Sequence, residues 1–265
     1  MSNANVSSSL RGWSVICLRP HEDQAAVARA IALRGAQPIA LPGLRLAPPD
    51  DTKLATVQLR NALACEAVVF TSPAAVRFAA ALMPLAPAAM RNVFALGSGT
   101  ARALASFGVQ VTQPEPDAMH SEGLMALQAL AQVRGTIGLV TAPGGRGVLL
   151  QAWSEQGRDV AIANVYRRLP PQFDGGDIDA LLASTSPRAV LVTSIEALRF
   201  VIDTLPMPAR HCLLDAVAVV SSMRLSEAAR AAGFAKVLLA SSPESGSLLD
   251  ALAQHEFTLR RPPET

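Results

Sequence analysis

The sequence has little aromatic content, little charge and little cysteine. Aromatic residues make up 4% of the 265 residues and charged residues 17%, whereas hydrophobic residues reach 50% and are mostly Ala, Leu and Val. A β-sandwich requires more Tyr, Phe and Thr, so this composition favours helices packed on sheets. The length is sufficient for one large domain or for two of ordinary size.

Basic residues are scattered, and the formal net charge is only +2. The densest basic pairs are Arg167-Arg168 and Arg260-Arg261. A protein that binds a nucleic-acid duplex usually carries a basic stripe and a recognisable motif for base contacts. The sequence shows neither feature, so we expect no nucleic-acid partner.

The three cysteines, Cys17, Cys65 and Cys212, are far apart and odd in number, which argues against a disulfide framework. Residues 1–12 lack the apolar core of a signal peptide. No apolar run reaches the roughly 18 residues of a membrane span. We therefore expect a cytoplasmic protein with no membrane partner.

Sequence motifs for cofactors are incomplete. Residues 97–99 (Gly-Ser-Gly) begin like a dinucleotide fingerprint, but Arg102 stands where its third glycine belongs. Residues 143–147 lack the Gly-Lys-Ser/Thr ending of a phosphate-binding loop. The four histidines have no partners at metal-ligand spacing. We expect neither a cofactor nor a metal.

Short apolar runs alternate with helical patterns along the chain. The run and helix pairs are 14–18 with 22–33, 67–70 with 73–82, 93–96 with 100–107, 137–141 with 147–156, 189–193 with 195–204, and 217–220 with 225–232. Repeated strand–helix units predict parallel sheets with helices on both faces.

The chain also repeats itself internally. Residues 71–78 (TSPAAVRF) match residues 193–200 (TSIEALRF), 122 residues later. The segment 19–35 matches 142–157 at an offset of 122 to 123, and 97–108 matches 222–233 at 125. Three matches at nearly one offset indicate two copies of one α/β unit. The extended segments 37–42 and 160–167 follow equivalent helices and could pair as a connection between two lobes.

Several predicted helices begin directly after a strand with small or hydroxyl-bearing residues. In parallel sheets these turns share the carboxyl edge, where backbone N–H groups and helix dipoles favour anions. Each one is equally compatible with a plain helix N-cap. The turns are Thr71-Ser72, Ser98-Gly99-Thr100, Gly144-Gly145, Thr193-Ser194 and Ser221-Ser222.

The single tyrosine, Tyr166, lies in the extended segment 160–167 and precedes Arg167 and Arg168. Two interpretations remain open for it. Tyr166 is either a packing residue whose hydroxyl faces solvent, or a proton donor or orienting hydroxyl that faces a ligand.

Taken together, these motifs resemble the uroporphyrinogen-III synthase family over roughly residues 13 to 255. The resemblance is specific because the motifs occur in the family's order and spacing. They are Arg19-Pro20 with the helix closing on Gly35, Phe70 to Val76, Gly97 to Ala101, Ser121 to Leu124, Gly144 to Arg146, Val165 to Arg168, and Thr193-Ser194.

The resemblance implies an α/β fold of two flavodoxin-like parallel-sheet lobes from an internal duplication, joined by a two-stranded β ladder. Lobe 1 is discontinuous and comprises residues 13–38 plus 168–258, and lobe 2 comprises 43–163. The ladder strands are expected at 39–42 and 164–167. Residues 1–12 and 259–265 are expected to be flexible tails.

The resemblance further implies the reaction. Hydroxymethylbilane, a linear tetrapyrrole with eight carboxylates, is cyclised to uroporphyrinogen III with inversion of ring D and loss of water, in heme and siroheme biosynthesis. The enzyme would be a lyase of the hydro-lyase type that works as a monomer. A transient contact with the preceding pathway enzyme is compatible with this picture.

The implied catalytic residue is Tyr166, as a general acid or orienting hydroxyl. One departure from the family pattern is Leu225, which stands in the second copy where Thr100 stands in the first, so Ser222 would have to replace that hydroxyl. The implied substrate-binding residues are Arg19, Thr71, Ser72, Gly97, Ser98, Thr100, Ser121, Gly144, Arg146, Thr193, Ser194 and Ser222.

Two other functions are compatible with parts of this pattern. A non-catalytic two-lobed protein that binds a small molecule or tetrapyrrole would keep the duplication but could lose Tyr166 and the hydroxyl-bearing turns. A two-domain nucleotide-dependent transferase is disfavoured by the missing phosphate loop.

Overall fold

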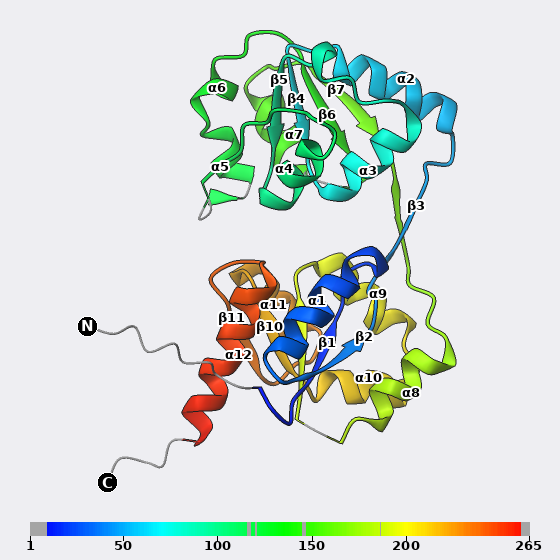
Figure 1. The fold of residues 1–265 in the computed structure, drawn as a ribbon, viewed down its shortest axis with the longest axis vertical. Coiled ribbons are helices and arrows are strands. Elements are labelled where there is room, and N and C mark those ends of the chain that lie inside the picture. The colour runs from blue at the N-terminus through cyan, green and yellow to red at the C-terminus, as the bar shows by residue number, and fades with distance from the viewer. Residues whose placement is uncertain (1–9, 116–117, 120, 145–146, 186, 261–265) are drawn as a thin grey trace, which may run out of the picture. The chain divides into compact units, whose positions relative to one another are not determined.

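Parallel β-sheets flanked by helices form both parts of the chain (Figure 1). The computed structural model describes residues 10–115, 118–119, 121–144, 147–185 and 187–260. The chain divides into unit 1, which comprises Met1–Arg45 and Leu169–Thr265, and unit 2, which comprises Leu46–Arg168. Each unit is described below by itself.

The sheet of unit 1 has the parallel strand order β11-β10-β9-β1-β2. Its strands are β1 (Ser14–Cys17), β2 (Gln37–Ala40), β9 (Arg188–Val192), β10 (Val217–Val220) and β11 (Val237–Leu239). The helices are α1 (His21–Leu33), α8 (Gly175–Ala183), α9 (Ile195–Thr204), α10 (Met207–Leu214), α11 (Met223–Ala231) and α12 (Ser245–Arg260).

The sheet of unit 2 has the parallel order β5-β4-β6-β7. Its strands are β4 (Ala67–Phe70), β5 (Asn92–Ala95), β6 (Ile137–Thr141) and β7 (Val160–Asn164), and an isolated bridge pairs Phe94 with Thr112. The helices are α2 (Thr52–Leu63), α3 (Pro73–Leu82), the 3-10 turn η1 (Pro87–Ala89), α4 (Ser98–Ala105), α5 (Ser121–Met125), α6 (Gln128–Ala131) and α7 (Gly147–Glu155).

The two sheets are built from the same elements in a different chain order. Strands β6, β7, β4 and β5 of unit 2 correspond to β1, β2, β9 and β10 of unit 1 at offsets of 122 to 125 residues. The order β2-β1-β9-β10 therefore repeats as β7-β6-β4-β5. Because the first strand–helix unit of the chain joins its C-terminal part, the two copies are interleaved along the sequence.

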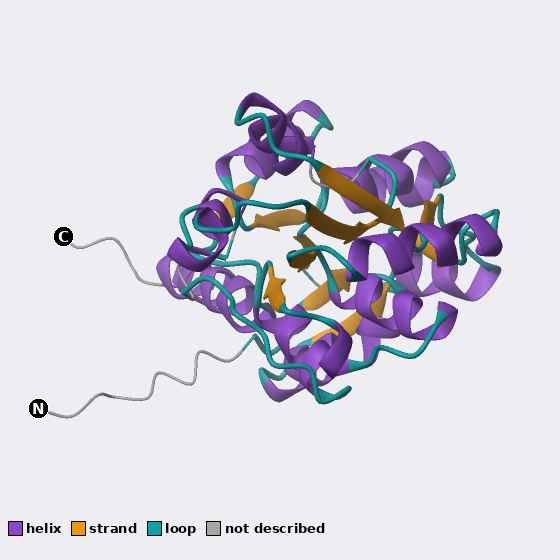
Figure 2. Cartoon of the chain, turned by 90° about the horizontal axis from the view of Figure 1, so that it is seen from above, coloured by secondary structure: helices purple, strands orange, loops and turns teal. Residues whose placement is uncertain are grey.

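Alternation of side chains along the strands places an apolar core on each face of each sheet. In unit 1, Ile16 and Val190 pack with α9, α10 and α11 on one face. On the other face, Val15 and Ala189 pack with α1 and α12. Unit 2 repeats this arrangement, with α2, α3 and α4 on one face and α5, α6 and α7 on the other. Helices thus flank the strands, as Figure 2 shows by colour.

The ends of several helices follow the local sequence. Left-handed glycines stand just after the ends of α1, α4, α7 and α11, where a side chain would be strained. The β2 strand contains Pro38, which an edge strand tolerates because it needs no N–H on its open side. No helix among the described residues is long and apolar enough to cross a membrane.

The predicted ladder strands, 39–42 and 164–167, are misplaced. Segment 37–40 is β2 and pairs in parallel with β1, because it completes a strand–helix–strand unit, and 160–164 is β7 and pairs with β6 in the same way. The ladder is instead a small antiparallel sheet of β3 (Arg45–Ala47) and β8 (Arg167–Leu169). These strands lie 122 residues apart, so each copy contributes the same strand to the ladder.

Close packing of α2 on β6 supplies a test of this fold. A Cβ atom on Gly138 in β6 would collide with the backbone carbonyl of Ala62 in α2. We predict that Gly138→Ala lowers the free energy of unfolding by about 2 kcal/mol or more in urea denaturation. Gly147→Ala in the same unit is the control, because an added Cβ there has no neighbour within 4 Å. An equal effect of both changes would contradict the packing described.

Candidate active site

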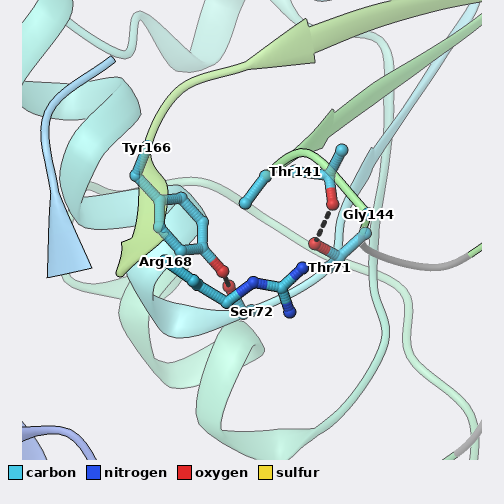
Figure 3. A pocket seen from close by; sticks show the side chains of 7 residues that line it. Thr71, Ser72, Thr141, Gly144, Tyr166 and Arg168 are labelled. Atoms are coloured by element: carbon cyan, nitrogen blue, oxygen red, sulfur yellow. Dashed lines mark hydrogen bonds between the residues drawn. The ribbon is translucent and has the colours of Figure 1, made fainter. Parts of the chain in front are cut away.

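A polar pocket of about 150 Å³ lies at the carboxyl edge of the unit 2 sheet (Figure 3). The pocket forms at this edge because β4 ends at Phe70 and β6 ends at Thr141, and the residues at and after these strand ends lie close together. All of the lining residues belong to unit 2. They are Thr71, Ser72, Thr141, Ala142, Gly144, Tyr166 and Arg168.

Ser72 links a helix start to the tyrosine. Its hydroxyl oxygen accepts a hydrogen bond from the backbone N–H of Ala75 at 3.1 Å, which makes Ser72 the N-cap of α3. The same hydroxyl lies 3.1 Å from the Tyr166 hydroxyl, close enough for a hydrogen bond with either group as donor. The Ser72 side chain therefore does two things at once: it caps α3 and it contacts the Tyr166 hydroxyl.

The ring of Tyr166 is held by packing. Only 6% of the residue is exposed, and its ring stacks on Phe78 of α3 with centroids 5.4 Å apart and planes 15° apart. The ring belongs to the apolar core of unit 2, while the hydroxyl reaches the pocket. The packing interpretation of Tyr166 is thus correct for its ring, and the hydroxyl faces the pocket rather than bulk solvent.

Two threonines occupy another part of the pocket lining. The Thr71 hydroxyl donates to the Thr141 hydroxyl oxygen at 3.0 Å, and both residues are buried. Thr141 was not among the expected site residues. It is the last residue of β6, so the rule that placed Thr71 at a carboxyl edge could also have found Thr141.

Arg168 is the charged residue in the pocket lining. Its Nη2 donates to the carbonyl oxygen of Pro143 at 2.8 Å. That nitrogen would lie 3.8 Å from a Cβ on Gly144, which has a left-handed φ of 70°. Arg168 was also missed, although Tyr166 and Arg168 are two positions apart and so point to one side of an extended segment.

The predicted residues on α4 and α5 lie outside this pocket. The N–H of Ser98, next to the N-cap Gly97, donates to the Met119 sulfur at 3.4 Å, so a thioether already lies against this helix start. Thr100 and Ser121 are buried, at 3% and 6% exposure. Arg146 falls outside the described residues.

Three of the four predicted side chains of unit 1 form hydrogen bonds with backbone groups of the same unit. Ser194 caps α9 and Ser222 caps α11, while Arg19 donates to the Pro243 carbonyl at 2.5 Å and Thr193 precedes the α9 cap. The expectation that Ser222 replaces a ligand-binding hydroxyl of Thr100 stays a prediction. Leu225, like Thr100, is a buried helix residue, at 7% exposure.

Metal and thiol chemistry have little support in this structure. No group of three metal-ligating side chains occurs among the residues that the structure describes. The three cysteines are unpaired, and desolvation by burial raises the pKa of each thiol. A raised pKa leaves less of the reactive thiolate at neutral pH, so these thiols are poor nucleophiles.

The double contact of Ser72 gives a second test. We predict that Ser72→Ala costs about 1–2 kcal/mol of unfolding free energy through loss of the cap. A double-mutant cycle with Tyr166→Phe should show a further coupling of about 1 kcal/mol from the hydroxyl pair. Ser222→Ala, which also removes a cap, is the control and should be additive with Tyr166→Phe. A Ser72–Tyr166 coupling of zero would show that the hydroxyl pair does not form.

A family model and two curated relatives give the same family. The family model described as "Uroporphyrinogen-III synthase HemD" matches residues 25–250. Uroporphyrinogen-III synthase of Escherichia coli (strain K12) is 29% identical over 163 residues, which span 61% of this chain and 66% of that protein. The corresponding protein of Salmonella typhimurium (strain LT2) is 30% identical over 172 residues, 64% of this chain and 68% of the relative. These alignments span about two thirds of each relative's length.

Solved structures give the same fold. A mutant uroporphyrinogen III synthase from the extremely thermophilic bacterium Thermus thermophilus matches with a TM-score of 0.58 and 22% identity, over 92% of this chain and 99% of that one. Uroporphyrinogen-III synthetase from Helicobacter pylori 26695 also gives a TM-score of 0.58, with 15% identity over 95% of this chain and 100% of that one. The family-model match covers most of the chain, and the chain therefore belongs to the uroporphyrinogen-III synthase family, a family of enzymes of the lyase class.

Proposed function

We propose that this chain cyclises hydroxymethylbilane to uroporphyrinogen III, with inversion of ring D and loss of water. The observation that carries the proposal is the Tyr166–Ser72 hydroxyl pair, set beside Arg168 in a polar pocket of a member of this family. A phenol and a guanidinium suit a substrate that loses a hydroxyl group and carries many carboxylates.

The reaction determines what the protein must supply. The pyrrole nitrogen of the terminal ring pushes out the hydroxyl group, so departure requires only modest acid assistance. Closure without inversion occurs spontaneously and gives the other isomer. The enzyme must therefore hold the chain in the geometry that leads to inversion and act faster than this default, which is mainly a positioning effect.

Tyr166 is suited to the acid assistance. One lone pair of the Ser72 hydroxyl oxygen is used by the Ala75 N–H, while its hydrogen remains able to donate to Tyr166. In that arrangement the phenol hydrogen is directed into the pocket, where it can be donated to the departing hydroxyl, which leaves as water. The stack on Phe78 keeps the ring from turning away.

Substrate carboxylates are proposed to bind the other polar groups at this edge. Thr71, Ser72 and Gly144 lie in the pocket lining, which supports a direct role for them. The remaining expected contacts stay predictions: Arg19, Gly97, Ser98, Thr100, Ser121, Arg146, Thr193, Ser194 and Ser222.

We also propose that the protein works in the cytoplasm as a monomer, with at most transient contact with the preceding pathway enzyme. The three unpaired cysteines support a reducing compartment. A site lined by residues of one unit of one chain supports the monomer.

The product isomer tests the proposed function. Freshly prepared hydroxymethylbilane is supplied to the protein, the products are oxidised to porphyrins, and the two isomers are separated chromatographically. Isomer III should form faster than spontaneous closure. Formation of isomer I alone, at the rate seen without protein, would refute the function.

Removal of the phenol hydroxyl tests the role of Tyr166. We predict that Tyr166→Phe lowers kcat for isomer III by about 100-fold, the lower end of typical acid–base contributions, and leaves measurable activity because positioning remains. Complete loss of activity in a variant with an unchanged circular dichroism spectrum would contradict the claim that positioning supplies most of the catalytic effect.

A further inference from the structure

The two copies of the α/β unit differ at the pocket in an instructive way. Thr71 and Ser72 of unit 2 recur in unit 1 as Thr193 and Ser194, and both serines cap a helix. Tyr166 and Arg168, by contrast, correspond at the same offset of 122 to Leu44 and Leu46.

The leucines show what the fold itself requires at these two positions. Leu44 of unit 1 is buried at 6% exposure, so an apolar side chain satisfies the turn at the position equivalent to Tyr166. Leu46, the equivalent of Arg168, is partly buried against the apolar core of unit 2 itself. A tyrosine is therefore not needed at this turn to build an α/β unit of this type, and a ladder strand accepts an apolar residue at the position equivalent to Arg168. A guanidinium at a half-buried position costs desolvation, which a function at the pocket would explain.

The guanidinium of Arg168 is held so that it faces the pocket. Its Nη2 is fixed by the Pro143 carbonyl, and Figure 3 draws the group between the Tyr166–Ser72 pair and the Thr71–Thr141 pair. A guanidinium has five N–H donors in a rigid fork whose geometry matches the two oxygens of a carboxylate. Among the described residues that line the pocket, none is acidic.

The pocket volume limits what can enter. About 150 Å³ is below the roughly 300–1,000 Å³ of sites that hold a whole drug-sized ligand. It can accommodate one or two substituents of a pyrrole ring but not a tetrapyrrole. The pocket is therefore a subsite for one end of the substrate, with the hydroxyl pair and the cation side by side.

We propose that Arg168 binds a side-chain carboxylate of the terminal ring that carries the hydroxymethyl group, and that this ion pair places that ring on unit 2. The inference rests on the proposed function. A hydroxymethyl group and a carboxylate side chain on neighbouring ring carbons would reach Tyr166 and Arg168 together. A carboxylate held beside the ring would also stabilise the positive charge that develops on the ring as water leaves.

The test compares two adjacent arginines. Arg168→Gln should lower kcat/KM for isomer III by roughly 10- to 100-fold, mainly through a higher KM, because a charge-assisted hydrogen-bonded pair is lost. Arg168→Lys should recover part of the loss, since it keeps the charge. The control is Arg167→Gln, because Arg167 instead bonds the Pro48 carbonyl at 3.0 Å and pairs with Asp50. This control should change kcat/KM by no more than about twofold.

The outcomes separate this inference from the proposed function. If the wild-type protein makes isomer III while Arg168→Gln keeps the wild-type kcat/KM, or loses no more than Arg167→Gln, the inference fails and the function stands. If the wild-type protein makes only isomer I, the function fails. Should Arg168→Gln not fold, Arg168→Leu, which installs the residue of the other copy, replaces it. Failure of both to fold would show that Arg168 is structural and would overturn the inference.

Discussion

The hydrogen bond between the hydroxyls of Ser72 and Tyr166 connects the start of helix α3 to the segment between β7 and β8. It depends on the parallel sheet, because the carboxyl ends of β4 and β7 bring the residues that follow them to one edge. It also depends on the stack of Tyr166 on Phe78, which fixes the ring inside an apolar core. The chemical part of the site, a phenol hydroxyl that reaches a small pocket beside a serine hydroxyl, follows from these two constraints.

The duplication explains how such a site can be added to a stable scaffold. Both copies need a capped helix after a central strand, and Ser72 and Ser194 supply the cap in each. At the positions equivalent to Tyr166 and Arg168, the duplicated segment carries the apolar residues Leu44 and Leu46. One unit therefore carries the polar pair, and a substrate whose two ends differ can be bound in one orientation.

Sequence patterns predicted much of the fold because burial determines them. Apolar runs marked most strands, helical spacing marked most of the longer helices, and left-handed glycines marked several helix ends. The ladder was misplaced because residues 37–40 and 160–164 have the pattern of extended chain. That pattern does not show whether a segment pairs within the main sheet or forms a separate ladder. Of the pocket lining, the sequence analysis named Thr71, Ser72, Gly144 and Tyr166. It missed Thr141 and Arg168, although the end of a strand and the two-residue spacing from Tyr166 could have indicated them.

The same limit applies to the hydroxyl-bearing turns, three of whose serines cap helices. A strand followed by Thr-Ser indicates a helix start whether or not a ligand binds there, so Ser194 and Ser222 could not be distinguished from Ser72 in advance. The α4 start, predicted as an anion site, lies against the sulfur of Met119, a contact between residues 21 positions apart that no local pattern encodes.

The central claim is that the reacting end of the substrate binds in the unit 2 pocket. The most direct measurement is a crystal structure of this chain with a stable bilane in which a methyl group replaces the hydroxymethyl group. The account predicts that the methyl-bearing ring lies at Tyr166 and Ser72, with a side-chain carboxylate on Arg168. Location of that ring against unit 1, with the unit 2 pocket holding the opposite end of the bilane or none of it, would contradict the account.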